Sequence, residues 1–121
     1  MDSHHEKTPK VMIVDDQLGV RMLLEETFKS EDCCVLTAQD GLKALELLEK
    51  EQPAAIFIDY KMPTMNGLEV AKKIKEKGYK CKIVLMTAYG EIANLNHAEV
   101  NDYLIKPFDI QKARDILHSI L

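Results

Sequence analysis

Short apolar runs alternate with longer amphipathic stretches along the whole chain. Short runs rich in Val, Ile and Leu and bounded by polar or turn-forming residues are typical of buried strands. Between them, apolar residues recur every three or four positions, which is the period of a helix with one buried face. The pattern predicts strands at residues 10–14, 33–38, 54–58, 81–86 and 102–105, with helices between and after them.

Capping residues indicate where the predicted helices begin and end. Asp40 and Asp109 are N-cap candidates, and Asn66 followed by Glu69 resembles a capping box. The first helix is expected to end near Ser30. The residues expected to face inward are, helix by helix, Val20, Leu23, Leu24 and Phe28; Leu42, Leu45 and Leu48; Gly67, Val70, Ala71 and Ile74; and Ile110, Ala113, Ile116, Leu117 and Ile120.

The order of the predicted elements restricts the topology. Strands joined by helices of this length cannot be hairpins, so they should be parallel, with right-handed crossovers and helices on both faces. We therefore predict an α/β fold, a (βα)5 doubly wound parallel five-stranded sheet with the flavodoxin-like strand order 2-1-3-4-5. In such sheets, ligands bind outside the carboxyl ends of the strands, here between strands one and three.

Length and charge limit the classes of protein to consider. The chain has 121 residues, and we expect a flexible N-terminal tail at 1–9 and one domain at 10–121. The formal net charge is −4 and basic residues are not clustered, which argues against binding to nucleic acid. No apolar run approaches the roughly 20 residues needed to cross a bilayer, so no membrane contact and a cytoplasmic location are expected.

Polar side chains stand at the carboxyl ends of four predicted strands. Asp15 and Asp16 follow strand one, Asp59 follows strand three, Thr87 follows strand four and Lys106 follows strand five. These residues should meet at one edge of the sheet. Three crowded carboxylates repel one another unless a cation lies among them, and Mg²⁺ prefers oxygen ligands. The sequence therefore predicts a magnesium site at this edge.

A carboxylate beside Mg²⁺ can also act as a nucleophile. Attack by Asp59 on phosphorus would give an aspartyl-phosphate, and phosphoryl transfer depends mainly on positioning and charge neutralisation. Mg²⁺, Lys106 and Thr87 could each hold one phosphoryl oxygen. A single strand-end aspartate is more often a helix cap or loop residue. The prediction therefore depends on finding suitable residues at the ends of four different strands.

Four segments carry a resemblance to a known family. They are VDDQ at 14–17, IDYKMPTMNG at 58–67, MTAYG at 86–90 and IKPF at 105–108. In order and spacing they resemble the receiver domains of bacterial two-component response regulators, over 10–121. Within that family the chain is most similar to the single-domain regulators of sporulation phosphorelays.

The resemblance implies a role for each strand-end residue. Asp59 would be the phosphoacceptor, with Lys106 as the phosphate-binding lysine and Thr87 as the switch hydroxyl. Mg²⁺ would be held by Asp15, Asp16, Asp59 and the backbone carbonyl of Lys61. The family pattern also implies a cis bond before Pro107 and makes Tyr103 a candidate switch aromatic, although Tyr103 could equally be an ordinary half-buried strand residue.

The resemblance further implies a docking surface on the first predicted helix. Its members would be Gln17, Leu18, Gly19, Arg21 and Met22. Leu18 and Met22 are four positions apart, so they share a face away from the core stripe, which suits contact with a partner helix. The alternative is a frayed first turn in which Leu18 packs on a loop and Met22 is a lone exposed apolar residue.

The segment between Gly90 and Lys106 is shorter than the resemblance leads us to expect. Its fourth helix should be short by about a turn or partly irregular, because Asn94, Asn96 and Asn101 are poor residues for a helix interior. We therefore assign no role to the face that most receivers use to dimerise or to pair with output domains.

Together these features predict a stand-alone receiver. It would accept a phosphoryl group from a sensor histidine kinase onto Asp59, with Mg²⁺, and relay it to a histidine phosphotransferase. We expect a monomeric phosphoacceptor module that catalyses only its own phosphorylation and dephosphorylation, and is otherwise not an enzyme.

Three other functions would use a similar set of strand-end residues. A chemotaxis-type regulator would bind a motor switch, and Gln17, Lys61 and Tyr89 argue mildly against it. A small Mg²⁺-dependent phosphohydrolase would need an acidic residue two positions after the nucleophile, where this chain has Lys61. A flavin or dinucleotide module would need a glycine-rich phosphate loop after strand one, and the sequence has none there.

Overall fold

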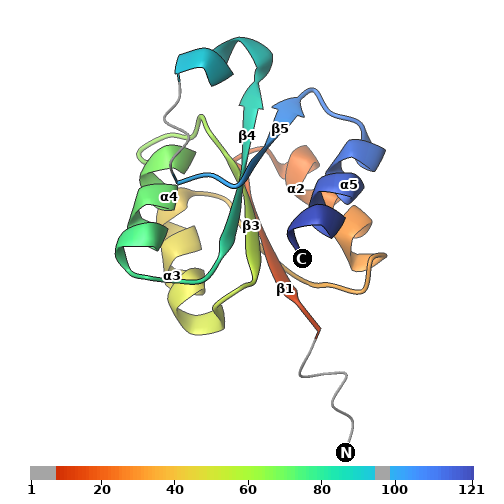
Figure 1. Cartoon of the computed structure of the whole chain (residues 1–121), viewed down its shortest axis with the longest axis horizontal. Helices are drawn as coiled ribbons and strands as arrows, with labels where there is room; N and C mark the ends of the chain where they lie inside the picture. The colour runs from red at the N-terminus through yellow and green to blue at the C-terminus, as the bar shows by residue number, and fades with distance from the viewer. Residues whose placement is uncertain (1–7, 95–98) are drawn as a thin grey trace, which may run out of the picture.

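The computed structural model of the chain describes residues 8–94 and 99–121 (Figure 1). Its strands are β1 (Lys10–Val14), β2 (Cys34–Ala38), β3 (Ala55–Asp59), β4 (Lys82–Ala88) and β5 (Asp102–Lys106). Its α-helices are α2 (Leu18–Lys29), α3 (Gly41–Glu51), α4 (Gly67–Glu76) and α5 (Ile110–Ile120), and η1 (Tyr89–Asn94) is a 3-10 helix.

The five strands form one parallel sheet in the order β2-β1-β3-β4-β5, as the sequence predicted. Helices α3 and α4 cover one face and α2 and α5 cover the other (Figure 1). Strand β1 pairs with both β2 and β3, so the strand order reverses beside it. The carboxyl ends of β1 and β3 therefore lie side by side, where ligands bind in sheets of this kind.

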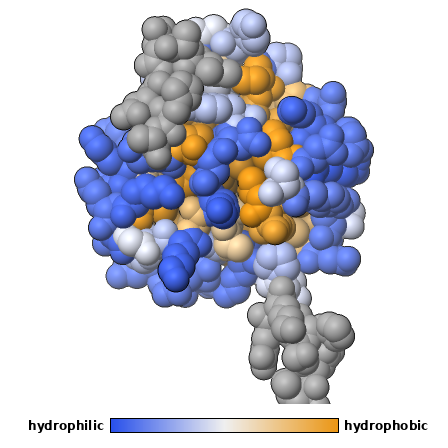
Figure 2. All heavy atoms as spheres, in the orientation of Figure 1, coloured by the Kyte–Doolittle hydropathy of each residue, from blue (hydrophilic) through white to orange (hydrophobic). Residues whose placement is uncertain are grey.

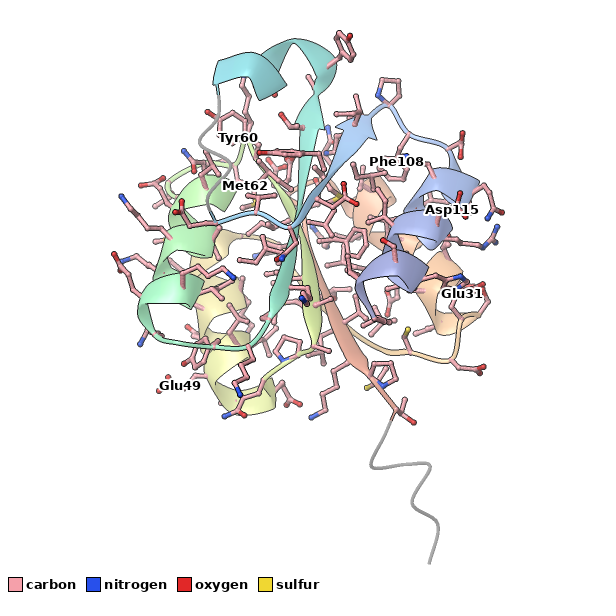
Figure 3. The ribbon with its side chains drawn as sticks, viewed as in Figure 1. Glu31, Glu49, Tyr60, Met62, Phe108 and Asp115 are labelled. Carbon is pink, nitrogen blue, oxygen red and sulfur yellow. The ribbon has the colours of Figure 1, made fainter. Side chains whose placement is uncertain are left out.

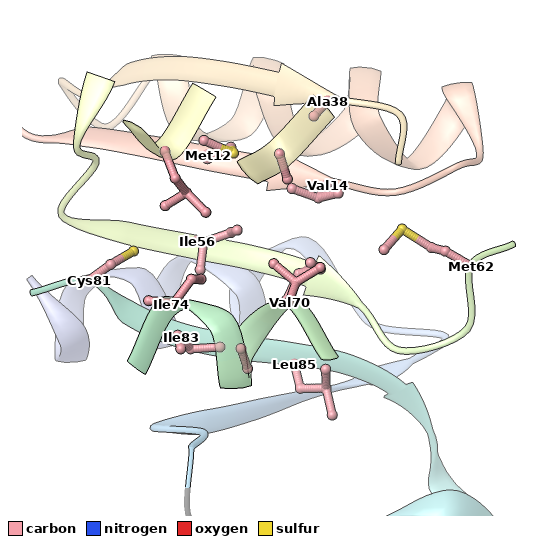
Figure 4. Packing of buried hydrophobic residues seen from close by; sticks show 14 residues of the cluster. Met12, Val14, Ala38, Ile56, Met62, Val70, Ile74, Cys81, Ile83 and Leu85 are labelled. Carbon is pink, nitrogen blue, oxygen red and sulfur yellow. The ribbon is translucent and has the colours of Figure 1, made fainter. Parts of the chain in front are cut away.

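The core consists of two apolar clusters, one on each face of the sheet. Every residue of β3 is buried, because helices cover both of its faces. Ile56 points into the cluster under α3 and α4 (Figure 4), and Ile58 belongs to the same cluster. Phe57 points into the opposite cluster, where its ring centroid lies 4.8 Å from that of Phe28. The ends of β1 and β3 are thus anchored in two packed layers.

Two residues predicted to face inward are exposed instead. Leu23 on α2 is 47% exposed and Leu42 on α3 is 56% exposed. On α2 the buried face includes Thr27, whose hydroxyl donates to the carbonyl of Leu23 at 2.8 Å and so enters the core without an unpaired polar group. The apolar spacing identified both helices correctly but misplaced one edge of each buried face.

The predicted helix caps are confirmed. The side chains of Asp40 and Asp109 accept from backbone N–H groups at the starts of α3 and α5. Asn66 and Glu69 exchange hydrogen bonds of 2.9 Å in a capping box at the start of α4. The connection after β4 begins with the 3-10 helix η1, which agrees with the irregularity expected there. Residues 95–98, among them Asn96, lie outside the described residues.

Most of the predicted N-terminal tail also lies outside the described residues. Of that segment, Pro9 takes part in the fold, since its carbonyl accepts from the N–H of Cys34 at 2.9 Å. The sheet pairing therefore begins one residue before Lys10. Within residues 8–94 and 99–121, no helix has the length and apolar character needed to span a bilayer.

Candidate functional site

Three carboxylates meet at the carboxyl edge of the sheet. Asp15 and Asp16 follow β1, and Asp59 is the last residue of β3. One oxygen from each lies within 4.8 Å of the other two. Asp15 and Asp59 are buried, whereas Asp16 is exposed. The structure thus brings together the predicted acidic group, with one member open to solvent.

Lys106 reaches this group from β5. Its Nζ lies 2.7 Å from Asp15 Oδ2 and 3.2 Å from Asp59 Oδ1. Burial alone would lower the pKa of Lys106, but the hydrogen bonds and charges of Asp15 and Asp59 outweigh burial and raise it. The predicted phosphate-binding lysine therefore carries its full positive charge among the carboxylates.

Asp59 has a perturbed carboxyl group. Burial, followed by the negative charge of Asp15, raises the pKa of Asp59 to about 6, and Lys106 opposes the rise. The single positive charge of Lys106 therefore offsets only part of the negative charge of the carboxylates. A cation among them would favour the ionised form of Asp59, which is the form that can act as a nucleophile.

Asp15 is held in place from two directions. Its Oδ1 accepts from the backbone N–H of Gln17 at 2.9 Å, and its carbonyl accepts from Arg21 Nη1 at 2.7 Å. Arg21, predicted as part of a partner surface, has a half-buried side chain that also braces the end of β1. Its hydrogen bond depends on α2 folding back beside β1, which the sequence pattern alone does not specify.

Thr87 is buried at the end of β4, and its hydroxyl is engaged. It donates to Glu91 Oε1 at 2.8 Å, and the N–H of Ala88 donates to the same oxygen at 3.1 Å. Lys61 Nζ lies 2.6 Å from Glu91 Oε2. The hydrogen bonds from Lys61 and Thr87 lower the pKa of Glu91 to about 2. Glu91 had no predicted role, and only its position four residues after Thr87 could have suggested one.

Gly67 is also closer to the site than its place in the sequence suggested. A Cβ atom at Gly67 would lie 2.5 Å from the backbone oxygen of Asp59 and 2.8 Å from Leu85 Cδ1. The N–H of Gly67 donates to the carbonyl of Tyr60 at 2.9 Å. The first turn of α4 therefore packs directly against the backbone of the phosphoacceptor candidate, near Tyr60 in Figure 3.

An apolar groove of about 400 Å³ lies beside the acidic group. The Lys106–Pro107 bond at its edge is cis, which confirms the expectation from the family resemblance. The groove is lined by Gln17, Val20, Leu23, Lys106, Pro107 and Phe108.

The structure also places the other residues predicted to contact partners or to act as a switch. Leu18 and Met22 on α2 are 61% and 56% exposed, as predicted. Tyr103 is half-buried on β5, and burial raises the pKa of its hydroxyl.

The geometry of this edge agrees with a family match. A family model described as the response regulator receiver domain matches residues 11–118. The chain belongs to this family.

Curated receiver relatives match along nearly the whole chain. The chain is 37% identical to sporulation initiation phosphotransferase F of Bacillus subtilis over 93% of each chain. It is 36% identical to a chemotaxis protein CheY homologue of Campylobacter jejuni, over 93% of this chain and 92% of that one. It spans 48% and 50% of the length of two other curated relatives.

A solved receiver structure gives the same fold. The response regulator protein TrrA of Thermotoga maritima, in complex with Mg²⁺ and BeF, superposes with a TM-score of 0.87 at 30% identity. The match covers 94% of this chain and 100% of that chain. Receiver domains bind Mg²⁺ at an aspartate cluster, which in this chain is Asp15, Asp16 and Asp59. Carboxylate oxygens gathered around a partly exposed edge fit Mg²⁺, which retains several waters when bound.

Proposed function

We propose that this receiver accepts a phosphoryl group from a histidine kinase onto Asp59 and passes it to a histidine phosphotransferase. The main support for this proposal is the buried Asp59 carboxylate at the edge of the sheet. Asp15 and Asp16 lie beside it, and Lys106 Nζ is 3.2 Å from its Oδ1. This combination supplies a nucleophile, ligands for a divalent cation and a fixed positive charge.

The chemistry follows from these positions. An Asp59 oxygen would attack the phosphorus of a phosphohistidine, forming a P–O bond while the P–N bond breaks and its electron pair goes to the leaving imidazole. Bound Mg²⁺ would neutralise charge on the phosphoryl oxygens. Lys106 would contact one oxygen after turning from Asp59, and Thr87 would donate to another. Asp15, Asp16, Asp59 and the Lys61 carbonyl would hold the ion.

The relay step rests on the surface beside the site. Leu18 and Met22 project from the start of α2, and Val20 and Leu23 of the same helix line the apolar groove together with Pro107 and Phe108. A partner helix lying across α2 would bury these side chains and could bring a histidine to Asp59. The 37% identity to a protein named as a phosphotransferase also supports this direction.

The experiment uses phosphoramidate, a small P–N donor, with Mg²⁺ and intact-mass detection. The proposal predicts addition of one phosphoryl group, its absence in Asp59→Asn, and its transfer to the histidine of a purified histidine phosphotransferase. An unmodified wild-type chain would refute the phosphoacceptor role. A stable phosphorylated chain that transfers to no histidine but binds a motor switch protein would favour the chemotaxis-type alternative, for which the 36% identity to a CheY homologue is the supporting observation.

A phosphohydrolase role is less well supported. That chemistry needs an acid or base two positions after the nucleophile, and the residue there is Lys61, whose ammonium is paired with Glu91 at 2.6 Å. A lysine held by a carboxylate stays protonated and cannot serve as the base that activates water. The site residues therefore favour a signalling module over a phosphohydrolase.

A further inference from the structure

Glu91 accepts three donors from two separate parts of the chain. Its Oε1 takes the hydroxyl of Thr87 at 2.8 Å and the N–H of Ala88 at 3.1 Å, both at the end of β4. Its Oε2 lies 2.6 Å from the ammonium of Lys61, in the connection between β3 and α4. One carboxylate thus ties the connection that follows Asp59 to the end of β4.

The hydroxyl of Thr87 cannot serve two acceptors. A threonine hydroxyl carries one hydrogen, and so does a backbone N–H. While Thr87 and Ala88 donate to Glu91, neither has a hydrogen to offer an anion on Asp59. Strands β3 and β4 are paired up to Asp59 and Met86, so these donors lie one and two residues beyond the residue paired with the phosphoacceptor candidate.

We propose that Glu91 is a positioning residue that holds the receiver in its unphosphorylated arrangement by competing with the phosphoryl group for the same donors. The proposal rests on the phosphoacceptor role of Asp59. An aspartyl-phosphate carries about −1.5 to −2 charges on three strong acceptor oxygens, in place of the single negative charge of the carboxylate. It attracts the donors of Thr87, Ala88 and Lys61, and it repels the like charge of Glu91.

Release of Glu91 would move the segment that carries it. Glu91 belongs to η1, which directly follows β4, and the hydrogen bonds to Thr87 and Ala88 fix the start of η1 against the end of that strand. When Thr87 turns to the phosphoryl group, η1 loses this attachment. Phosphorylation of Asp59 is thereby communicated to the surface formed by residues 89–91.

Binding of beryllofluoride in the presence of Mg²⁺ tests this competition, because the probe supplies anionic acceptors on Asp59 without chemistry. Glu91→Ala and Glu91→Gln should each bind the probe more tightly than wild type, by about two- to fivefold, as expected for one partly exposed charged interaction. Glu49→Ala, on an exposed glutamate at the far end of α3, is the matched control and should not change binding (Figure 3).

A double-mutant cycle with Thr87→Val separates competition from a general structural effect. If Glu91 acts by holding the hydroxyl, most of the gain from Glu91→Ala should disappear when Thr87→Val is already present. The proposal is overturned if Glu91→Ala binds the probe equally or less tightly, or if its gain survives in full beside Thr87→Val. If the wild-type chain binds no beryllofluoride at all, the phosphoacceptor role itself fails and the competition fails with it.

Discussion

The ammonium nitrogen of Lys106 lies 3.2 Å from Asp59 Oδ1, although β4 separates the two strands that carry these residues. The side chain extends across the carboxyl end of β4 and also reaches Asp15 at 2.7 Å. Lys106 therefore occupies a place among the carboxylates where a divalent cation would also be attracted, and it provides the charge that a phosphoryl group would need.

Lys106→Met should consequently have opposite effects on two ligands. Removal of the positive charge should strengthen Mg²⁺ binding several-fold, because the cation no longer meets a like charge. The same change should weaken beryllofluoride binding in Mg²⁺, because the anion loses its fixed counter-charge. Calorimetric titrations of both ligands measure this, with Lys72→Met on the exposed side of α4 as the control. If the affinities for Mg²⁺ and for beryllofluoride change in the same direction, Lys106 does not have the two opposite roles assigned to it.

The raised pKa of Asp59 predicts how stability depends on pH in protein stripped of divalent cations. The pKa is 3.8 for an ordinary aspartate and about 6 for Asp59 in the folded chain. The folded chain therefore holds this proton more tightly than the unfolded chain, so the free energy of unfolding should fall as pH rises from about 4 to about 6. Urea denaturation in a chelator, followed by circular dichroism, measures this decline.

Asp59→Asn removes that titration. It should be more stable than wild type above pH 6, by up to about 3 kcal/mol for a shift of about two units, and the difference should vanish near pH 4. Mg²⁺ should stabilise the wild type more than the variant, since the ion compensates the carboxylates. If the free energies of unfolding of the two proteins change in parallel between pH 4 and pH 7, the charge of Asp59 does not destabilise the folded chain.

Much of the site could be predicted because the topology fixes it. Once the strands are parallel, the residues that follow them must share one edge, so Asp15, Asp59, Thr87 and Lys106 could be brought together from the sequence. Apolar spacing specified the buried faces less well, since a stripe can include a threonine whose hydroxyl bonds within its own helix, as on α2.

The contacts that sequence reasoning missed depend on local backbone geometry. Glu91 meets Thr87 only because the chain turns into a 3-10 helix after β4. Arg21 meets the carbonyl of Asp15 only because α2 packs back along β1. Neither contact has a periodic signal, since each joins a side chain to a group whose position is set by a turn or by tertiary packing.

Gly67→Ala tests the contact between α4 and the backbone of Asp59. The added Cβ would lie 2.5 Å from the Asp59 oxygen, so β3 and α4 must separate, at a cost of about 1–3 kcal/mol as for other overpacked sites. Beryllofluoride binding should weaken as well, because Asp59 moves. Gly19→Ala is a matched control: its Cβ would meet nothing within 4 Å on α2, and it should be neutral or stabilising by up to about 1 kcal/mol. Equal stabilities of the two variants would show that Gly67 is not needed for close packing.

Leu18 and Met22 provide a test of the docking surface. Both side chains are largely exposed on α2, so their truncation should leave the free energy of unfolding nearly unchanged. In a complex they would be buried against a partner helix, and truncation of an apolar anchor at an interface costs on the order of 1–2 kcal/mol. The double variant Leu18→Ala with Met22→Ala should therefore slow transfer from phosphorylated Asp59 to a histidine phosphotransferase by about tenfold or more.

Phosphorylation by phosphoramidate, which needs no protein partner, should change much less than this transfer in the same double variant. The two rates can be measured side by side by intact mass. Leu121→Ala removes an exposed leucine at the C-terminal end of α5, away from the carboxyl edge of the sheet, and serves as the control for loss of apolar surface in general. Equal slowing of transfer by the control would mean that α2 is not the docking helix. Equal slowing of both reactions in the double variant would mean that Leu18 and Met22 act on the site itself.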